Sequence, residues 1–184
     1  MSFNEPFRLH GARGVLEAIG GASQFERHIE ALERAVRENP GMAFDLAKSL
    51  VESVCKTILG DRGQTEIGNP DLPDLLNRTI NCIPLIPNKP TDGESKTEKA
   101  VRNAVSGLNR IVNALAELRN EAGTIGHGRD LLDDSLDSIH AQLTARSADA
   151  VVHFLYFAHR ADGTDLSLTR LRYDEDTIFN TFCD

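Results

Sequence analysis

Apolar residues recur three and four positions apart along most of the chain, which is the spacing of one face of a helix. This pattern predicts helices over residues 22–38, 42–60, 99–122 and 138–159, with a shorter one within 69–83. No segment alternates apolar and polar residues as a half-buried strand does. We therefore predict an all-α fold, a bundle of four to five main helices whose site is built from side chains on facing helices.

The segments without a helical period divide the chain. Residues 84–98 contain three prolines and a glycine, which predicts a loop. We expect an N-terminal extension over 1–21, a helical domain over 22–160 and an acidic C-terminal arm over 161–184. The arm is expected either to form a short helix or to pack on a partner subunit.

Composition narrows the class of protein. Hydrophobic residues make up 40% and charged residues 26%, a balance typical of a soluble globular domain. No stretch approaches the roughly 18 uninterrupted apolar residues that a membrane span needs, and no secretory signal is evident, so we expect a cytoplasmic protein. The three cysteines are far apart without a C-x-x-C pair, which predicts reduced thiols and no zinc site.

The net charge of −8 is unevenly distributed. Residues 96–129 carry 6 basic and 3 acidic side chains, whereas residues 130–184 carry 4 and 11. The total charge argues against coating nucleic acid by bulk electrostatics, because phosphate binding depends on local Lys and Arg. Residues 96–129 are therefore the block of the sequence best suited to contact phosphate.

The end of this block, "LAELRNEAGTIGHGR" (115–129), has an unusual pattern. Arg119 follows Val112 by seven residues and Val105 by fourteen, so it continues an apolar helix face. A guanidinium there needs a partner such as a carboxylate, carbonyl groups, a ligand phosphate or a subunit seam. The structural alternative is that Arg119 caps the helix C-terminus, with Gly123 just past the end.

His127 lies between two glycines of the same segment. Glycines permit unusual backbone angles and close approach of a ligand, which suits a binding site, although a histidine in a turn can also be structural. Upstream, Lys48, Glu52 and Lys56 lie four residues apart, beside the apolar face of the second predicted helix.

The segments "DLAKSLVESVCKTIL" (45–59) and "LAELRNEAGTIGHGR" together resemble the C-terminal domain family of bacterial abortive-infection proteins, which is similar to the HEPN superfamily of helical bundles. The resemblance spans roughly residues 28–159. It implies a phage-defence or toxin-type domain that acts as a metal-independent endoribonuclease with no cofactor. By position, it assigns catalysis to Arg119, Asn120 and His127.

We extend these assignments to substrate binding by the neighbouring and basic residues Gly126, Gly128, Arg129, Lys48 and Lys56. The expected partners are an RNA substrate, a second copy of the chain in a homodimer, and an antitoxin or other defence-system protein; no membrane is expected. Two alternatives stay open. One is a catalytically inactive nucleotide- or protein-binding dimerisation module, and the other is a plain scaffold in which the glycine segment is structural.

Overall fold

The computed structural model describes residues 6–64, 68, 70–86, 95–122 and 138–161. For residues 115, 116 and 118–122 it describes the backbone alone. The described residues contain six helices. The helices are α1 (His10–Ala18), α2 (Ser23–Glu38), α3 (Pro40–Asp61), α4 (Leu72–Cys82), α5 (Lys96–Ala122) and α6 (Ser138–Arg160). The described residues contain no strand. The predicted all-α bundle is therefore confirmed, with more helices than expected.

Local capping explains where two of the helices begin. The Asn39 side chain accepts a hydrogen bond from the backbone N–H of Met42 (3.2 Å), and Pro40 occupies the first position of α3. Asp71 caps α4 in the same way by accepting from the N–H of Asp74 (2.9 Å). Each cap satisfies a backbone donor that has no partner within its own helix.

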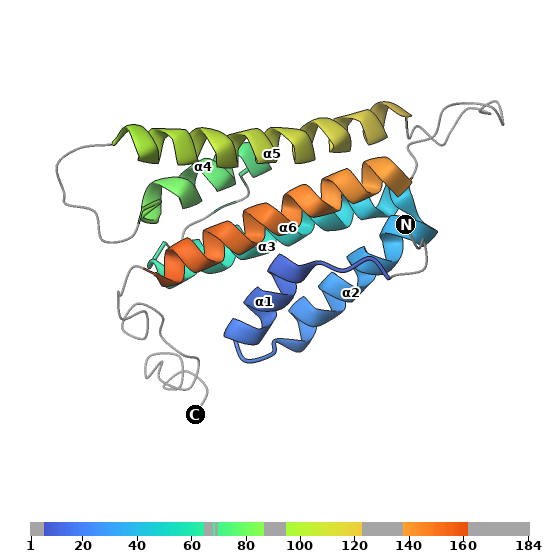
Figure 1. Ribbon diagram of the computed structural model, residues 1–184, viewed down its shortest axis with the longest axis horizontal. Helices are drawn as coiled ribbons and strands as arrows, with labels where there is room; N and C mark the ends of the chain where they lie inside the picture. The colour runs from blue at the N-terminus through green and yellow to red at the C-terminus, as the bar shows by residue number, and fades with distance from the viewer. Residues whose placement is uncertain (1–5, 65–67, 69, 87–94, 123–137, 162–184) are drawn as a thin grey trace.

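The centre of the bundle is the pair α3 and α6, which lie side by side with α4 and α5 on one side and α1 and α2 on the other (Figure 1). Both central helices bury an aliphatic face completely, including Leu50, Val51 and Ile58 on α3 and Val152 and Leu155 on α6. Burying a side chain of this kind contributes about 1.5–3 kcal/mol. The central pair therefore supplies the rigid frame on which α5 rests.

Helix α1 was not predicted, although it packs in the same core through Ala12, Val15 and Leu16. No side chain of its own caps its N-terminus. Instead, the Asp149 carboxylate of α6 accepts hydrogen bonds from the backbone N–H groups of Gly11 (3.1 Å) and Ala12 (2.7 Å). Asp149, which follows Ala12 by 137 residues, thus caps α1 in place of a neighbouring side chain.

Helix α5 begins three residues before the predicted start at Lys99, so the C-terminal boundary of the predicted 84–98 loop was wrong. The Ser95 hydroxyl accepts a hydrogen bond from the N–H of Glu98 (3.1 Å), and the two residues have the spacing of a capping box. The other predicted helices match α2, α3, α4 and α6 closely.

The close approach of α1 to α6 gives a first testable prediction. A Cβ at Gly11 would lie 2.7 Å from the Asp149 carbonyl oxygen and 2.8 Å from His153 Cβ, so Gly11→Ala is expected to destabilise the protein by about 1–3 kcal/mol. Gly14→Ala on the same helix is the matched control, because its Cβ would meet only Phe157 Cε2 at 4.0 Å. Chemical denaturation should give opposite signs, with Gly14→Ala stabilising by about 0.5–1 kcal/mol. Equal effects would contradict the packing described here.

Candidate functional site

The predicted catalytic pair lies in the last turn of α5. The helix continues through Arg119 and Asn120 and ends at Ala122, as the sequence predicted. Arg119 follows Val112, whose side chain is fully buried, by one heptad, so the helical register that motivated the prediction holds up to Val112. The side chains of Arg119 and Asn120 lie outside the described residues, and their catalytic roles remain predictions.

Four further residues of the predicted site come after α5 in the sequence. Gly126, His127, Gly128 and Arg129 all lie outside the described residues. Convergence of His127 with Arg119, within a subunit or across a dimer, therefore stays a prediction.

The two lysines assigned to substrate binding lie on α3. Lys48 and Lys56 are both exposed, two helical turns apart. Lys48 Nζ lies 4.0 Å from Glu52 Oε1, so it takes part in a surface ion pair of the predicted i, i+4 kind. Such a pair contributes at most about 0.5 kcal/mol and leaves the ammonium groups open to solvent. The prediction of RNA contacts by these lysines is thus sterically feasible and still untested.

A cleft of about 220 Å³, which the sequence patterns do not predict, lies between α4 and α5. One wall consists of Pro73, Leu76, Asn77 and Ile80 of α4. The other consists of Arg102, Ser106, Asn109, Arg110 and Asn113 of α5. The lining thus combines an apolar wall with two arginines and contains no carboxylate.

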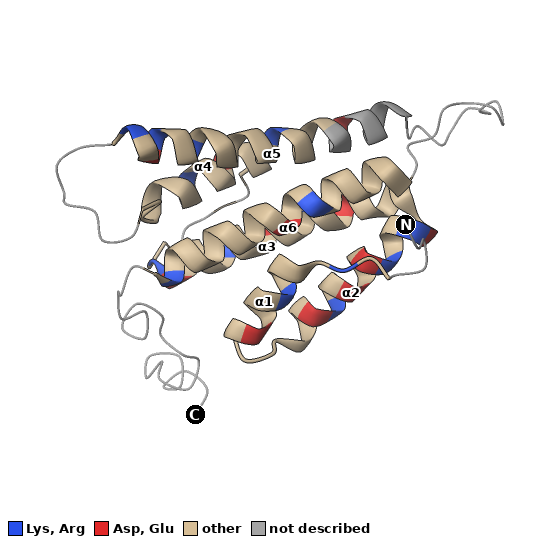
Figure 2. Cartoon of the chain, in the orientation of Figure 1, with Lys and Arg blue, Asp and Glu red and all other residues tan. Residues whose placement is uncertain are grey.

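The α5 wall of the cleft has a recognisable sequence spacing. Its residues follow one another at intervals of four, three, one and three, which places them on one helix face beside the apolar face. Asn120 follows Asn113 by one heptad, so the same helix register leads from the cleft towards the predicted site. The basic residues of α5 are visible along this helix in Figure 2.

Asn109 is the most unusual side chain of the cleft. It is only 5% exposed, and among the described residues its Oδ1 has no hydrogen-bond partner although the atom is buried. An unsatisfied buried polar atom costs about 1–3 kcal/mol, so it calls for an explanation. Nearby, Arg102 Nη1 donates to Asn81 Oδ1 (2.6 Å), which holds the Arg102 guanidinium against α4.

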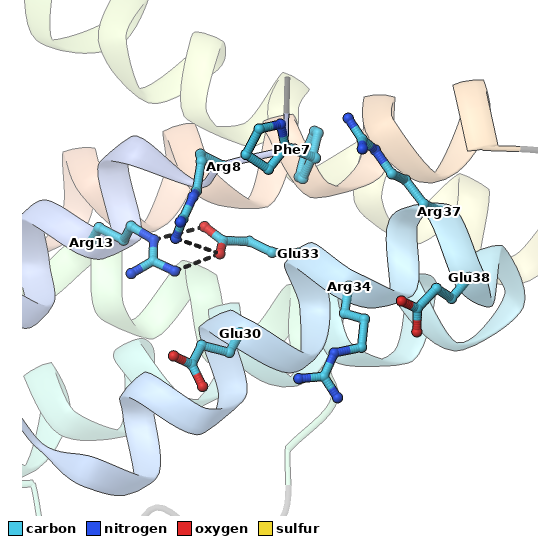
Figure 3. Close-up of a pocket in the computed structure, with 9 residues that line it drawn as sticks. Phe7, Arg8, Arg13, Glu30, Glu33, Arg34, Arg37 and Glu38 are labelled. Carbon is cyan, nitrogen blue, oxygen red and sulfur yellow. Dashed lines mark hydrogen bonds and ion pairs between the residues drawn. The ribbon is translucent and has the colours of Figure 1, made fainter. Parts of the chain in front are cut away.

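A second pocket, of about 380 Å³, lies between residues 6–13 and α2 (Figure 3). Four arginines line it, but three glutamates accompany them. Glu33 accepts hydrogen bonds from Arg13 Nε (2.8 Å) and from the Leu9 N–H (2.8 Å), and Arg8 Nη1 lies 3.5 Å from its other oxygen. This arrangement joins α1 to α2, so the pocket is a structural contact rather than an anion site.

His159 is a buried histidine that contacts both Arg62 and Asp61. Its side chain is fully buried; Arg62 Nε donates to Nδ1 (3.1 Å), and Nε2 lies 3.4 Å from Asp61 Oδ2. Burial and the adjacent Arg62 lower the pKa of His159 below its usual value, against a smaller opposing effect of Asp61. A neutral, inaccessible imidazole of this kind joins the ends of α3 and α6 and cannot reach a substrate.

The two described cysteines differ in exposure, since Cys55 is buried and Cys82 is half-buried. Cys55 and Cys82 are free thiols, as predicted, and burial raises the pKa of Cys55 to about 12.

The described residues contain no group of three His, Cys, Asp or Glu that could hold a metal ion. None of the described helices is long and apolar enough to cross a membrane.

The described helices define an all-α bundle domain in which the last turn of α5 carries the Arg–Asn pair. The family model of the HEPN-like domain Abi_C matches residues 23–159, which covers α2 to α6. The chain therefore belongs to the Abi_C family of HEPN-like domains, as the two sequence segments predicted. No curated protein and no solved structure matches the chain.

Helix α1 precedes the matched region, yet its apolar residues share the core with α2 and α6. The family match thus accounts for the five helices that carry the candidate site. The contacts of α1 with Glu33 and Asp149 are an additional feature of this chain.

Proposed function

We propose that the protein is a metal-independent endoribonuclease of a phage-defence or toxin system. The observation that carries the proposal is the Arg119–Asn120 pair and His127 at the end of the net-basic block, in a chain that belongs to a HEPN-like family. The substrate is RNA, because the reaction uses the ribose 2′-hydroxyl. The products are a 2′,3′-cyclic phosphate end and a 5′-hydroxyl end.

The chemistry follows from the three side chains. The 2′-oxygen attacks the adjacent phosphorus while the bond from phosphorus to the 5′-oxygen breaks. An imidazole titrates near neutral pH, so His127 accepts the 2′-hydroxyl proton or delivers a proton to the leaving 5′-oxygen. Arg119 offsets the charge that develops on the phosphate through paired N–H donors, and Asn120 orients the phosphate or His127.

A homodimer is part of this proposal, because Arg119 and His127 of two subunits can complete a shared site. We infer that the protein acts in the cytoplasm, where its RNA substrate and an antitoxin or other defence-system partner are found. Light scattering on the purified chain measures the oligomeric state directly.

The test is incubation of the purified full chain with total RNA in excess EDTA. Wild-type protein is expected to cleave, and His127→Ala is expected to reduce the rate by about 100-fold or more through loss of the general acid–base group. His10→Ala, which removes an exposed histidine of α1, is the matched control and should cleave normally. Mass spectrometry of the products identifies the cyclic phosphate. Absence of cleavage by a folded dimer would sink the enzymatic proposal.

A second candidate function is a catalytically inactive module that binds a nucleotide or a protein and dimerises. The observation that favours it is the seven-residue separation of Arg119 from His127, which is longer than is usual in HEPN ribonucleases. This module would bind RNA or nucleotide in EDTA without producing cyclic phosphate ends.

A further inference from the structure

We propose that the cleft between α4 and α5 binds one nucleotide, with its phosphate at Arg110 and its base or sugar against Asn109 and the apolar wall of α4. The inference rests on the proposed function, because it makes the cleft an accessory subsite for the RNA strand. It concerns residues that are separate from the predicted catalytic set.

The charges of the cleft favour a phosphate. Two of its lining side chains are arginines and none is a carboxylate, in a chain whose net charge is −8. Arg110 is exposed, and it forms no ion pair with another described residue. Arg13 and Arg8 of the pocket in Figure 3 differ in this respect, because Glu33 accepts from Arg13 and lies 3.5 Å from Arg8 Nη1. The planar guanidinium can donate two parallel hydrogen bonds to a phosphate.

Asn109 indicates that the ligand carries more than a phosphate. Its amide is buried in the wall of the cleft with Oδ1 unsatisfied among the described residues. An amide offers both an acceptor and two donors, and its oxygen and nitrogen can exchange places by a flip. The edge of a nucleobase presents a matching donor and acceptor, which inorganic phosphate lacks. Because Oδ1 is closed to solvent in this conformation, a bound base would satisfy the amide after such a flip or a small rotation of the Asn109 side chain.

The third part of the cleft is the apolar wall formed by Pro73, Leu76 and Ile80. Contact between the face of a base and apolar side chains is favourable and tolerant of sequence. A cavity of about 220 Å³ is smaller than the roughly 300–1,000 Å³ of sites for drug-sized ligands, so it excludes a folded RNA element and encloses part of a single nucleotide.

The distance to the predicted catalytic pair gives the subsite its role. Arg110 precedes Arg119 by nine residues, which is about 13.5 Å along the helix axis and about two and a half turns, so the two residues lie on opposite sides of α5. The cleft is thus too far away to hold the scissile phosphate. It would hold a flanking nucleotide of a single strand that passes around α5 from the side of Arg119 to the side of the cleft.

The test measures binding of a short fluorescein-labelled single-stranded RNA by anisotropy, in the His127→Ala background so that the RNA stays intact. Arg110→Gln is expected to weaken binding about 5–10-fold and to reduce the slope of log K against log salt by about 0.7, the value for one phosphate contact on a single strand. Asn109→Leu should weaken binding about fivefold without changing this slope, because it removes only an uncharged contact.

Lys99→Gln is the matched control, since it removes an exposed cation from α5 that does not line the cleft. It should change the affinity less than twofold. Equal effects of Arg110→Gln and Lys99→Gln would overturn the subsite, because they would indicate bulk electrostatics. Unchanged binding by a folded Asn109→Leu protein would overturn the assignment of a nucleotide.

Competition distinguishes the sources of the ligand. A nucleoside monophosphate that displaces the RNA from the parent protein, but not from Arg110→Gln, would show that the cleft takes a free nucleotide as well as a strand. Displacement by inorganic phosphate at the same concentration would reduce the cleft to an anion site and overturn the proposal. If binding follows the predicted pattern but the wild-type protein fails to cleave RNA, the subsite proposal stands and the ribonuclease proposal falls. If the wild-type protein cleaves RNA but binding does not follow the pattern, the ribonuclease proposal stands and the subsite proposal falls.

Discussion

Replacement of Arg119 by alanine is expected to lower the rate of RNA cleavage by about 100–1,000-fold, which is the usual effect of removing a group that stabilises transition-state charge. The reason is that the developing charge on the phosphate requires donors that are already in place. Arg119→Lys should recover little of the loss, because an ammonium cannot form two parallel hydrogen bonds to a phosphate. Single-turnover cleavage in EDTA measures both variants.

The same two variants test the structural role that the sequence leaves open for Arg119. A cation near a helix C-terminus contributes about 0.3–1 kcal/mol, and lysine supplies that charge as well as arginine does. If Arg119 only caps α5, Arg119→Lys should keep both stability and activity, and Arg119→Ala should lose stability in proportion to activity. Arg78→Ala, which removes a surface cation paired with Asp74 on α4, is the control for nonspecific loss of positive charge. A normal cleavage rate in a folded Arg119→Ala protein would end the catalytic assignment.

The sequence accurately predicts those helices in which apolar residues recur at helical spacing within the segment itself. In α3, for example, Leu50, Val54 and Ile58 recur four residues apart and are all buried. Burial of such an apolar face favours a helix whichever elements pack against it. The spacing alone is therefore sufficient to predict α3. Membership of the HEPN-like family was predictable for a similar reason, because both segments that carry the resemblance are contiguous in the sequence.

Helix α1 shows what local patterns cannot reveal. It contains Gly11 and Gly14, which disfavour a helix by about 1 kcal/mol each, and it lacks a capping side chain of its own. The partners that offset these costs, Glu33 and Asp149, lie on α2 and α6. The helical spacing of Ala12, Val15 and Leu16 is present in the sequence, but the two glycines and the missing cap weaken this signal, and the distant partners that compensate for them leave no local trace.

The candidate site likewise has one part that the local sequence predicts and another that depends on tertiary contacts. The position of Arg119 at the end of a buried helix face follows from heptad spacing, and α5 does extend that far. The cleft depends on α4 lying against α5, a tertiary contact across residues 83–95 that no spacing predicts. Its only trace in the sequence is the row of polar residues from Arg102 to Asn113 beside an apolar stripe.

Removal of the Glu33 carboxylate is expected to cause the largest loss of stability among the polar substitutions considered. Glu33 is 9% exposed and accepts from both Arg13 and the Leu9 N–H, so Glu33→Ala leaves a buried donor and a partly buried guanidinium without an acceptor. Breaking a buried pair costs about 3–5 kcal/mol, and partial exposure of Arg13 places the expected loss near the lower end. At this chain length, 3 kcal/mol corresponds to a Tm decrease of roughly 6–12 °C. Glu30→Ala, one turn earlier and exposed, should change stability by less than about 0.5 kcal/mol.

The pH dependence separates the charge of Glu33 from its packing. Burial raises the pKa of Glu33, but the hydrogen bonds from Arg13 and the Leu9 N–H outweigh burial, and the net pKa lies below 4.5. The unfolded chain therefore binds the proton first as the pH falls, and the stabilisation present above pH 4.5 is lost as the pH passes through the lowered pKa. The difference in unfolding free energy between wild type and Glu33→Gln should accordingly be constant near neutral pH and shrink on acidification below 4.5. A difference that stays constant down to the acid transition would mean that Glu33 holds α1 through shape alone, and that the ion pair with Arg13 contributes nothing to the docking of this helix.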